Sequence, residues 1–193
     1  MNRRRSRQRV RWLTRMALLT AAAVVLGYVE RLIPMPGSIP GIKLGLANTV
    51  LLYAIYLLDT RSAFVLMILK VGLSGLLYGG VSAMMFSLGG GLCSLVMMLL
   101  VKKLGGGNVS IIGVSVVGAV FHNVGQTAVA ALMVNTAALM GYVPFLLVAA
   151  VVTGVLTGIA GKYAIQGLKA SGLGNVSMPG KETKQDHPQE EPK

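Results

Sequence analysis

A series of long apolar segments constrains the fold of this chain more than any other feature of its sequence. Short breaks rich in polar, glycine or proline residues separate the segments, at 34–43, 58–61, 79–81, 102–110 and 140–144. A helix needs roughly 20 apolar residues to cross the hydrocarbon core of a bilayer. The chain is 54% hydrophobic and only 12% charged, which is outside the range of ordinary soluble domains. These features predict an all-α polytopic membrane protein.

The breaks predict a bundle of six transmembrane helices. They cover about residues 12–33, 44–58, 62–79, 82–101, 111–139 and 145–168. The second segment is short for a full span, so we expect it to start deeper in the membrane or to tilt. Residues 1–11 form a basic N-terminus before the transmembrane domain of residues 12–168. The tail, residues 169–193, is rich in Gly, Pro, Lys, Glu and Gln and is predicted to be disordered.

The distribution of positive charge predicts the orientation of the helices. Seven of the nine arginines lie before residue 16, and Arg61, Lys102 and Lys103 fall on the same predicted side. Because Lys and Arg are enriched in cytoplasmic loops, we expect a multi-pass protein of the cell membrane with both termini cytoplasmic. The net charge of +12 is not accompanied by a soluble fold or interleaved aromatic residues. It therefore favours contact with the lipid bilayer and argues against nucleic acid as a partner.

The first apolar segment is interpreted as a retained helix. Its basic start resembles a signal peptide, but the small residues 20–23 lie inside the apolar run rather than after it.

Hydrogen-bonding side chains share one face of the fifth segment. At about 100° per residue, His122 and Gln126 are about 40° apart on a helix, and Asn123 and Ser115 fall within the same arc. Lipid offers these groups no partners, so the face must contact protein or a wet cavity. Such a cluster indicates a functional site. The alternative is hydrogen bonding that only holds the helices together.

Lys70 is the most costly residue to place in the membrane, by roughly 2.5–3.5 kcal/mol at a helix centre. Ser74 lies about 40° from it around the helix, whereas Gly72, Gly75 and Gly79 cluster on the opposite face. One interpretation is that Lys70 lines a ligand cavity. The other is that it snorkels toward the interface or pairs with a helix C-terminus.

The predicted topology brings the unusual polar groups to similar depth. Lys70 and His122 fall near the middle of the membrane, Gln126 lies further outward, and Asn48 lies near the outer start of the second helix. Lys43 precedes that helix on the outer side. We therefore predict one ligand site in which Lys43 or Lys70 attracts negative charge, while the amides and the histidine orient the ligand.

The sequence offers little to catalysis or to metal binding. The only carboxylates of the membrane region, Glu30 and Asp59, are predicted on opposite sides, which excludes an aspartate-rich magnesium diphosphate site built by this chain alone. The only other histidine, His187, lies in the tail, and the lone Cys93 forms no CxxC site. The glycines at 89–91 lack the flanking residues of a phosphate loop and favour close helix packing. We predict no catalytic residue, no metal and no cofactor.

Two further segments have candidate roles. Ala17 and Ala21 stand at i and i+4 on the first helix, a spacing that permits helix docking and that also occurs often by chance. The proline- and glycine-rich segment 34–41 is a stiff outer loop. It is either a simple connector or a lid over an outward-opening site.

Several short motifs carry a resemblance to a known family. They are PGIKLGLAN at 40–48, LLYGG at 76–80 with SLGG at 87–90, and GVS at 113–115 followed by GAVFHNVGQ at 118–126. With these motifs the chain, over about residues 12–168, resembles the Gx transporter family, whose members are often labelled heptaprenyl diphosphate synthase component I. That family in turn resembles the substrate-binding S components of energy-coupling factor transporters.

The resemblance implies a six-helix bundle that binds a small molecule near its outer face, under a lid from the first loop. It also implies docking onto a transmembrane coupling protein that is driven by two cytoplasmic ATPases. Small residues on the first helix mediate this docking in those transporters, and Ala17 and Ala21 match the pattern. Lys70 stands where related chains often carry a basic residue. The chain has no Walker motif, so ATP-driven transport would require partners.

We therefore expect a substrate-binding subunit for uptake of a small polar or anionic molecule, and not an enzyme. One alternative is a membrane accessory subunit of heptaprenyl diphosphate synthase. The chain would then be an accessory and not a catalytic subunit, because it lacks the acidic cluster that such catalysis needs. Another is an assembly partner or flavin-precursor carrier in an extracytoplasmic electron-transfer system.

Overall fold

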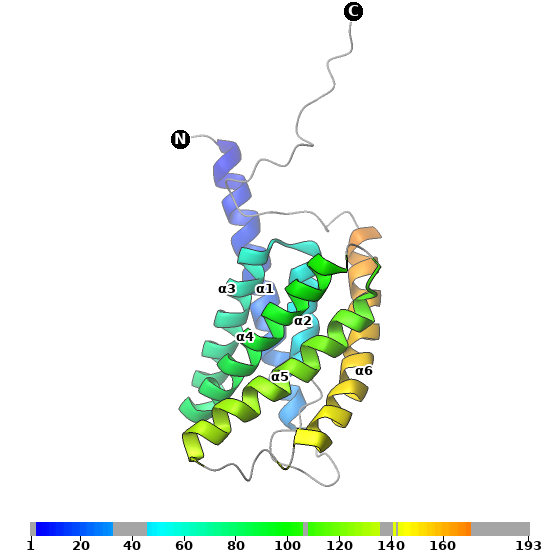
Figure 1. The fold of residues 1–193 in the computed structure, drawn as a ribbon. Helices are drawn as coiled ribbons and strands as arrows, with labels where there is room; N and C mark the ends of the chain where they lie inside the picture. The colour runs from blue at the N-terminus through cyan, green and yellow to red at the C-terminus, as the bar shows by residue number, and fades with distance from the viewer. Residues whose placement is uncertain (1–2, 33–45, 106–107, 136–140, 142, 171–193) are drawn as a thin grey trace, which may run out of the picture.

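A computed structural model describes residues 3–32, 46–105, 108–135, 141 and 143–170 (Figure 1). The main helical elements of these ranges are α1 (Arg3–Leu32), α2 (Leu46–Leu57), α3 (Thr60–Ser74), the π-helix η1 (Gly75–Gly79), α4 (Gly80–Leu104), α5 (Ile111–Val134) and α6 (Val143–Ala170). The described residues contain no strand, so the all-α prediction is confirmed for this part of the chain.

Within the described residues, four helical segments are long and apolar enough to cross a membrane, namely Ser6–Leu32, Thr60–Leu104, Ile111–Val134 and Val143–Gly167. α2 is apolar but shorter. The chain is therefore a membrane protein by the length and composition of its helices. The count of six crossings stays a prediction, because α3, η1 and α4 follow one another without a break and α2 does not reach the length of a full span.

The helices form a bundle in which α4 and α5 lie in front of α2 (Figure 1). α1 packs against α2 and α3, α3 packs against α4, and α5 lies between α4 and α6. α6 returns to α2 and completes the bundle. The N-terminal part of α1 extends beyond the other helices (Figure 1).

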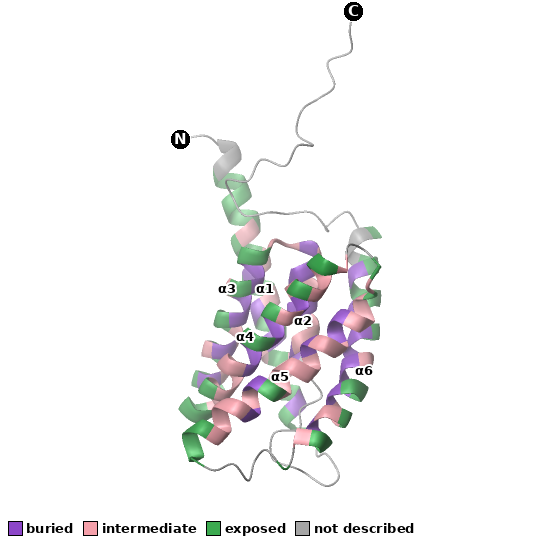
Figure 2. Ribbon diagram, in the orientation of Figure 1, coloured by how far each residue is buried: buried purple, intermediate pink, exposed green. Residues whose placement is uncertain are grey.

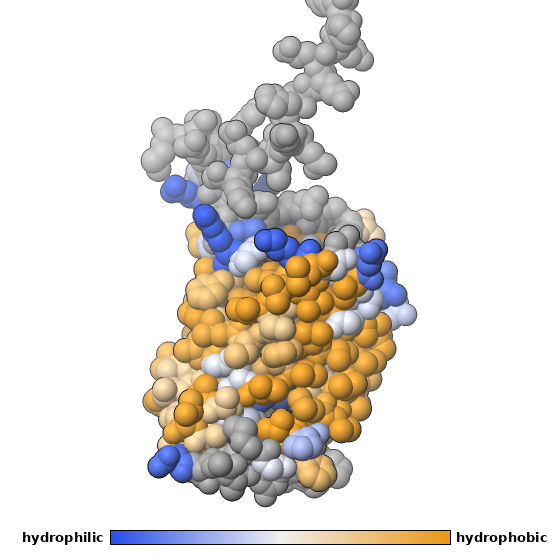
Figure 3. Space-filling view, viewed as in Figure 1, coloured by the Kyte–Doolittle hydropathy of each residue, from blue (hydrophilic) through white to orange (hydrophobic). Residues whose placement is uncertain are grey.

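α2 supplies the centre of the core. Its residues Leu51, Leu52, Ala54 and Ile55 are each at most 3% exposed (Figure 2). Large apolar side chains cover the outside instead, and Leu76 is 81% exposed. Figure 3 shows these outer residues as an apolar belt, with hydrophilic residues near its two ends. Such a belt is stable against lipid tails and unfavourable in water.

Glycines let α5 and α6 approach each other closely. A Cβ added at Gly154 would lie 2.7 Å from Val116 Cα, and one added at Gly158 would lie 2.9 Å from Ile112 Cα. The two backbones are therefore in van der Waals contact, as small residues at i and i+4 permit in membrane helices.

The chain reverses direction where α3 meets α4. Gly80 has φ +76°, which is favourable for glycine alone, and it directly follows the π-turn of η1. Beyond this turn α4 packs back along α3, with Gly91 against the side chain of Met67. A π-turn adds a residue to the helical repeat, and π-turns frequently occur at functional sites.

Helix ends differ from the sequence prediction at two places. α1 already begins at Arg3, so most of the predicted basic N-terminus at 1–11 is helical. α5 ends at Val134 rather than at residue 139, because Asn135 adopts the left-handed conformation (φ 51°) that terminates helices. The predicted disordered tail and the outer loop at 34–41 lie outside the described residues, apart from the end of α6.

Candidate functional site

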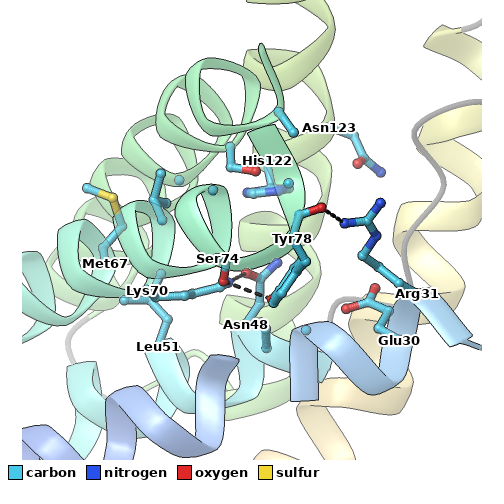
Figure 4. A pocket seen from close by; sticks show the side chains of 18 of the residues that line it. Glu30, Arg31, Asn48, Leu51, Met67, Lys70, Ser74, Tyr78, His122 and Asn123 are labelled. Carbon is cyan, nitrogen blue, oxygen red and sulfur yellow. Dashed lines mark hydrogen bonds between the residues drawn. The ribbon is translucent and has the colours of Figure 1, made fainter. Parts of the chain in front are cut away.

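A cavity of about 250 Å³ opens between the helices at the end of the bundle away from the N-terminus. It is bounded by the C-terminal end of α1, the start of α2, the junction of α3, η1 and α4, and the middle of α5 and α6 (Figure 4). Its polar and charged lining residues are Glu30, Arg31, Asn48, Lys70, Ser74, Tyr78, Ser87, His122, Asn123 and Thr153. Polar groups from all six α-helices and η1 thus meet inside an otherwise apolar bundle.

Lys70 and Asn48 form a hydrogen bond with each other in the wall of the cavity. The ammonium of Lys70 on α3 donates a hydrogen bond of 2.8 Å to Oδ1 of Asn48 on α2. Both residues are half-buried. A charge in this position is stabilised by contact with a polar partner, because lipid supplies none. Lys70 thus lines this cavity, and its role in binding a ligand stays a prediction.

Tyr78 forms a second polar group beside the lysine. Its hydroxyl lies 2.9 Å from Ser74 Oγ and 3.2 Å from the carbonyl oxygen of Val24 on α1. The guanidinium of Arg31 donates to the Tyr78 carbonyl oxygen and lies 5.3 Å from the centre of the Tyr78 ring. The centres of the Tyr28 and Tyr78 rings lie 5.6 Å apart. Tyr78 therefore links η1 to the C-terminal half of α1.

The π-turn explains why this part of the site departs from the predicted helix faces. Gly75 and Gly79 line the cavity together with Lys70 and Ser74, whereas a regular helix would place the glycines on the opposite face. Gly75 still donates its amide to the Val71 carbonyl oxygen and packs against Met84 of α4, as the predicted close-packing face requires, so the change of register in η1 affects Gly79 and not Gly75. Gly72 precedes the π-turn and has open space around it, with no atom within 4 Å of an added Cβ.

The polar side chains of α5 have different surroundings: some line the cavity, and others lie at helix interfaces. His122 and Asn123 line the cavity, and the Asn123 amide also donates to the carbonyl oxygen of Leu146 on α6, at 3.3 Å. Gln126 is not among the lining residues, and its Oε1 is buried without a hydrogen-bond partner in the described part of the chain. Ser115 hydrogen-bonds Thr157 of α6 at 3.1 Å. Of the predicted face, two residues reach the cavity and Ser115 holds helices together.

The glycines at 89–91 make room for the site. A Cβ added at Gly90 would lie 2.6 Å from His122 O and 3.1 Å from its ring atom Nδ1. The segment is regular helix within α4. This confirms the prediction of close helix packing in place of a phosphate loop.

The cavity lining carries a net positive charge. Lys70 and Arg31 are cationic and Glu30, only 8% exposed, is the one carboxylate among the described lining residues. This leaves one net positive charge with His122 neutral. Lys43, the other predicted cation, lies outside the described residues. In the part of the chain that the structure describes, no three His, Cys, Asp or Glu residues are grouped so that they could hold a metal ion.

Several lining residues were not predicted as site residues. Glu30 and Arg31 were visible in the sequence as adjacent charges at the end of an apolar segment, which is a usable signal. Tyr78 and Ser87 fall in the motifs that carry the family resemblance, but nothing in their spacing points to a cavity. Thr153 lies in an unbroken apolar run and gave no signal.

The predicted docking residues lie on the outside of the bundle. Ala17 and Ala21 are both exposed on α1, on the apolar surface that also carries Leu13 and Leu18. Their position leaves a second helix free to approach α1 there.

Comparison with known proteins identifies a matching family. The family model described as Heptaprenyl diphosphate synthase component I matches residues 19–164, which is well over half of the chain and includes the whole described cavity lining. No curated protein and no solved structure matches the chain.

Proposed function

Because the chain belongs to the heptaprenyl diphosphate synthase component I family, which is the Gx transporter family, we propose that it is an integral membrane substrate-binding subunit. It captures a small polar or anionic molecule from outside the cell and works with a membrane coupling protein and cytoplasmic ATPases. The observation that carries this proposal is the Lys70–Asn48 pair, which faces a polar cavity inside an apolar bundle.

The size of the cavity supports a small ligand. A volume of about 250 Å³ holds roughly eight waters at about 30 Å³ each. It falls just below the range of roughly 300–1,000 Å³ that is typical of pockets for drug-sized ligands. This volume supports a ligand of the size of a small metabolite.

The chemistry of the cavity supports an anion or a polar molecule with a negative group. Lys70 and Arg31 outweigh Glu30 in charge, and the water-poor surroundings strengthen their attraction for an anion. Asn48, Asn123 and the hydroxyl groups of the lining supply both donors and acceptors, which orient a ligand. The aromatic ring of Tyr78 gives it an apolar surface.

A second candidate function follows from the description of the family, which names a component of a prenyl diphosphate synthase. The carboxylates of the described lining are limited to Glu30, and diphosphate transfer needs several to hold magnesium. Under this alternative the chain is a non-catalytic accessory subunit. Its role would be to hold a soluble prenyltransferase at the membrane.

Native mass spectrometry of the full chain, purified gently from its own membrane, separates the two functions. The transport proposal predicts a bound small molecule together with a membrane coupling protein and ATPase subunits. The accessory-subunit alternative predicts a soluble prenyltransferase instead, and loss of prenyl chain elongation when the chain is deleted. Recovery of the prenyltransferase without any coupling protein would refute the transport proposal.

A further inference from the structure

A second cavity, of about 460 Å³, lies at the opposite end of the bundle from the first. It is formed where α2 and α4 end and α5 begins, beside the C-terminal half of α6. Its lining residues are Tyr56, Lys102, Val109, Ser110, Ile111, Ile112 and Lys162. Lys102 is two residues from the end of α4, or about 3 Å along the axis at 1.5 Å per residue. The cavity is therefore at the level where membrane helices meet lipid headgroups.

The lining of this second cavity is positively charged, and we call it the basic cavity. Lys102 and Lys162 are both part of its lining, and the described lining residues include no carboxylate. Ile111 and Ile112, the first two residues of α5, also line it, and their amide groups have no acceptor within the helix. The positive end of the helix dipole adds to the charge of the lysines.

Lys102 and Tyr56 contact each other in the wall of the basic cavity. The Lys102 ammonium donates to the carbonyl oxygen of Ile55 and lies 4.5 Å from the centre of the Tyr56 ring. The Tyr56 hydroxyl is buried and has no hydrogen-bond partner in the described part of the chain. A buried hydroxyl without a partner is costly, and an acceptor atom of a ligand in the cavity would satisfy it.

The remaining wall is apolar and supplied mainly by Val109, Ile111 and Ile112. Cations beside branched aliphatic side chains suit a ligand with an anionic head and an acyl tail, which a free ion lacks. We propose that this basic cavity binds the phosphate group of an anionic membrane lipid. Basic pockets between helices on the cytoplasmic side recognise such headgroups. The proposal does not depend on a ligand in the first cavity.

The test uses the full chain in nanodiscs that contain equal amounts of phosphatidylglycerol and phosphatidylcholine. After release into the gas phase, native mass spectrometry counts which lipids stay bound. Lys162→Gln is the main variant, because Lys102→Gln also removes the bond to Ile55. Lys103→Gln is the matched control, since Lys103 neighbours Lys102, is exposed and does not line the cavity. Circular dichroism checks that each variant keeps its helix content.

We expect the wild type to retain phosphatidylglycerol in preference to phosphatidylcholine. Loss of one lysine should lower that preference about fivefold, and Lys103→Gln should leave it within about twofold. Equal retention of the two lipids, or an equal effect of Lys162→Gln and Lys103→Gln, would overturn the proposal. Displacement of phosphatidylglycerol by millimolar inorganic phosphate would also overturn it, because the site would then hold a free anion.

Discussion

Lys70 occupies the apolar part of α3, where a charged side chain disfavours membrane insertion by roughly 2.5–3.5 kcal/mol. Its hydrogen bond to Asn48 offsets part of this cost. A residue that only stabilised the bundle would be better replaced by an apolar side chain of the same shape. The ligand binding proposed above would account for a charge at this position.

Replacement of Lys70 separates stability from binding. In Lys70→Met we expect ligand affinity to fall about 10–100-fold, the effect of losing one hydrogen bond to a charged group. The melting temperature should change little, because removing the charge from the apolar bundle is favourable while Asn48 Oδ1 loses its hydrogen-bond donor. Thermal denaturation in detergent and a ligand-retention assay measure the two effects. A lower melting temperature with unchanged retention would show that Lys70 is structural.

His122 and Gln126 make a second pair of contrasting residues. His122→Ala should weaken ligand retention about tenfold, because the side chain lines the cavity. Gln126→Leu should leave retention unchanged, since Gln126 does not line the cavity, and it should stabilise the fold by removing a buried acceptor without a partner. The same two assays check both variants. Equal loss of retention in the two would place Gln126 in the site after all.

Much of the cavity lining could be predicted from single residues. Asn48, Lys70, His122 and Asn123 stood out because polar groups are rare in apolar segments, and the structure brings all four to one cavity. Gln126 could not be separated from them, because helical angle alone does not say which neighbouring helix covers a side chain. Tyr78 could not be found either, since its position depends on tertiary contacts with α1.

At the scale of elements, the length of the apolar segments predicted where helices end, but it did not predict the irregular π-turn. The predicted breaks at 58–61 and 102–110 coincide with the ends of α2 and α4. The π-turn at η1 leaves no periodic signal, because it adds only one residue to the repeat. It changes the register of Gly79, so the helix faces of this segment were predicted correctly only up to Gly75.

The contact between α5 and α6 depends on a glycine spacing that Gly158→Ala tests. The new Cβ would lie 2.9 Å from Ile112 Cα and 3.0 Å from Ser115 Cβ, so the helices must separate. Overpacking of this kind costs about 1–3 kcal/mol, which lowers the melting temperature of a chain of this size by several degrees. Thermal denaturation followed by circular dichroism measures the shift.

Gly167→Ala is the control on the same helix. An added Cβ at Gly167 has no atom within 4 Å, and alanine is the better helix former by about 1 kcal/mol. We expect this variant to melt at the wild-type temperature or slightly above it. If both alanine variants behaved alike, the close approach of α5 and α6 would not matter for stability.

At the scale of the whole molecule, the two ends of the bundle differ in charge. The end that holds the basic cavity carries Lys102, Lys103, Lys162 and the arginine-rich start of α1, whereas the ligand cavity lies at the other end. This separation agrees with a cytoplasmic N-terminus. With a cytoplasmic N-terminus, the proposed ligand cavity would open outward and the proposed lipid site would lie on the cytoplasmic side.

Cysteine labelling in cells tests this orientation. In a Cys93→Ser background, Gly141→Cys and Asn108→Cys place single thiols at exposed positions on opposite ends of the bundle. A membrane-impermeant maleimide should label the thiol at position 141 in intact cells, and that at position 108 only after permeabilisation. The reverse pattern would invert the topology and turn the ligand cavity toward the cytoplasm.

The central claim is that the cavity around Lys70 and Asn48 holds a small molecule. Native mass spectrometry of the full chain in its wild-type, Lys70→Met and Lys103→Met forms tests it most directly, because Lys103 is an exposed lysine outside the ligand cavity. We predict an added mass of metabolite size on the wild type and on Lys103→Met, and its loss from Lys70→Met. The same bound mass on all three forms, or no bound mass on any of them, would contradict the claim.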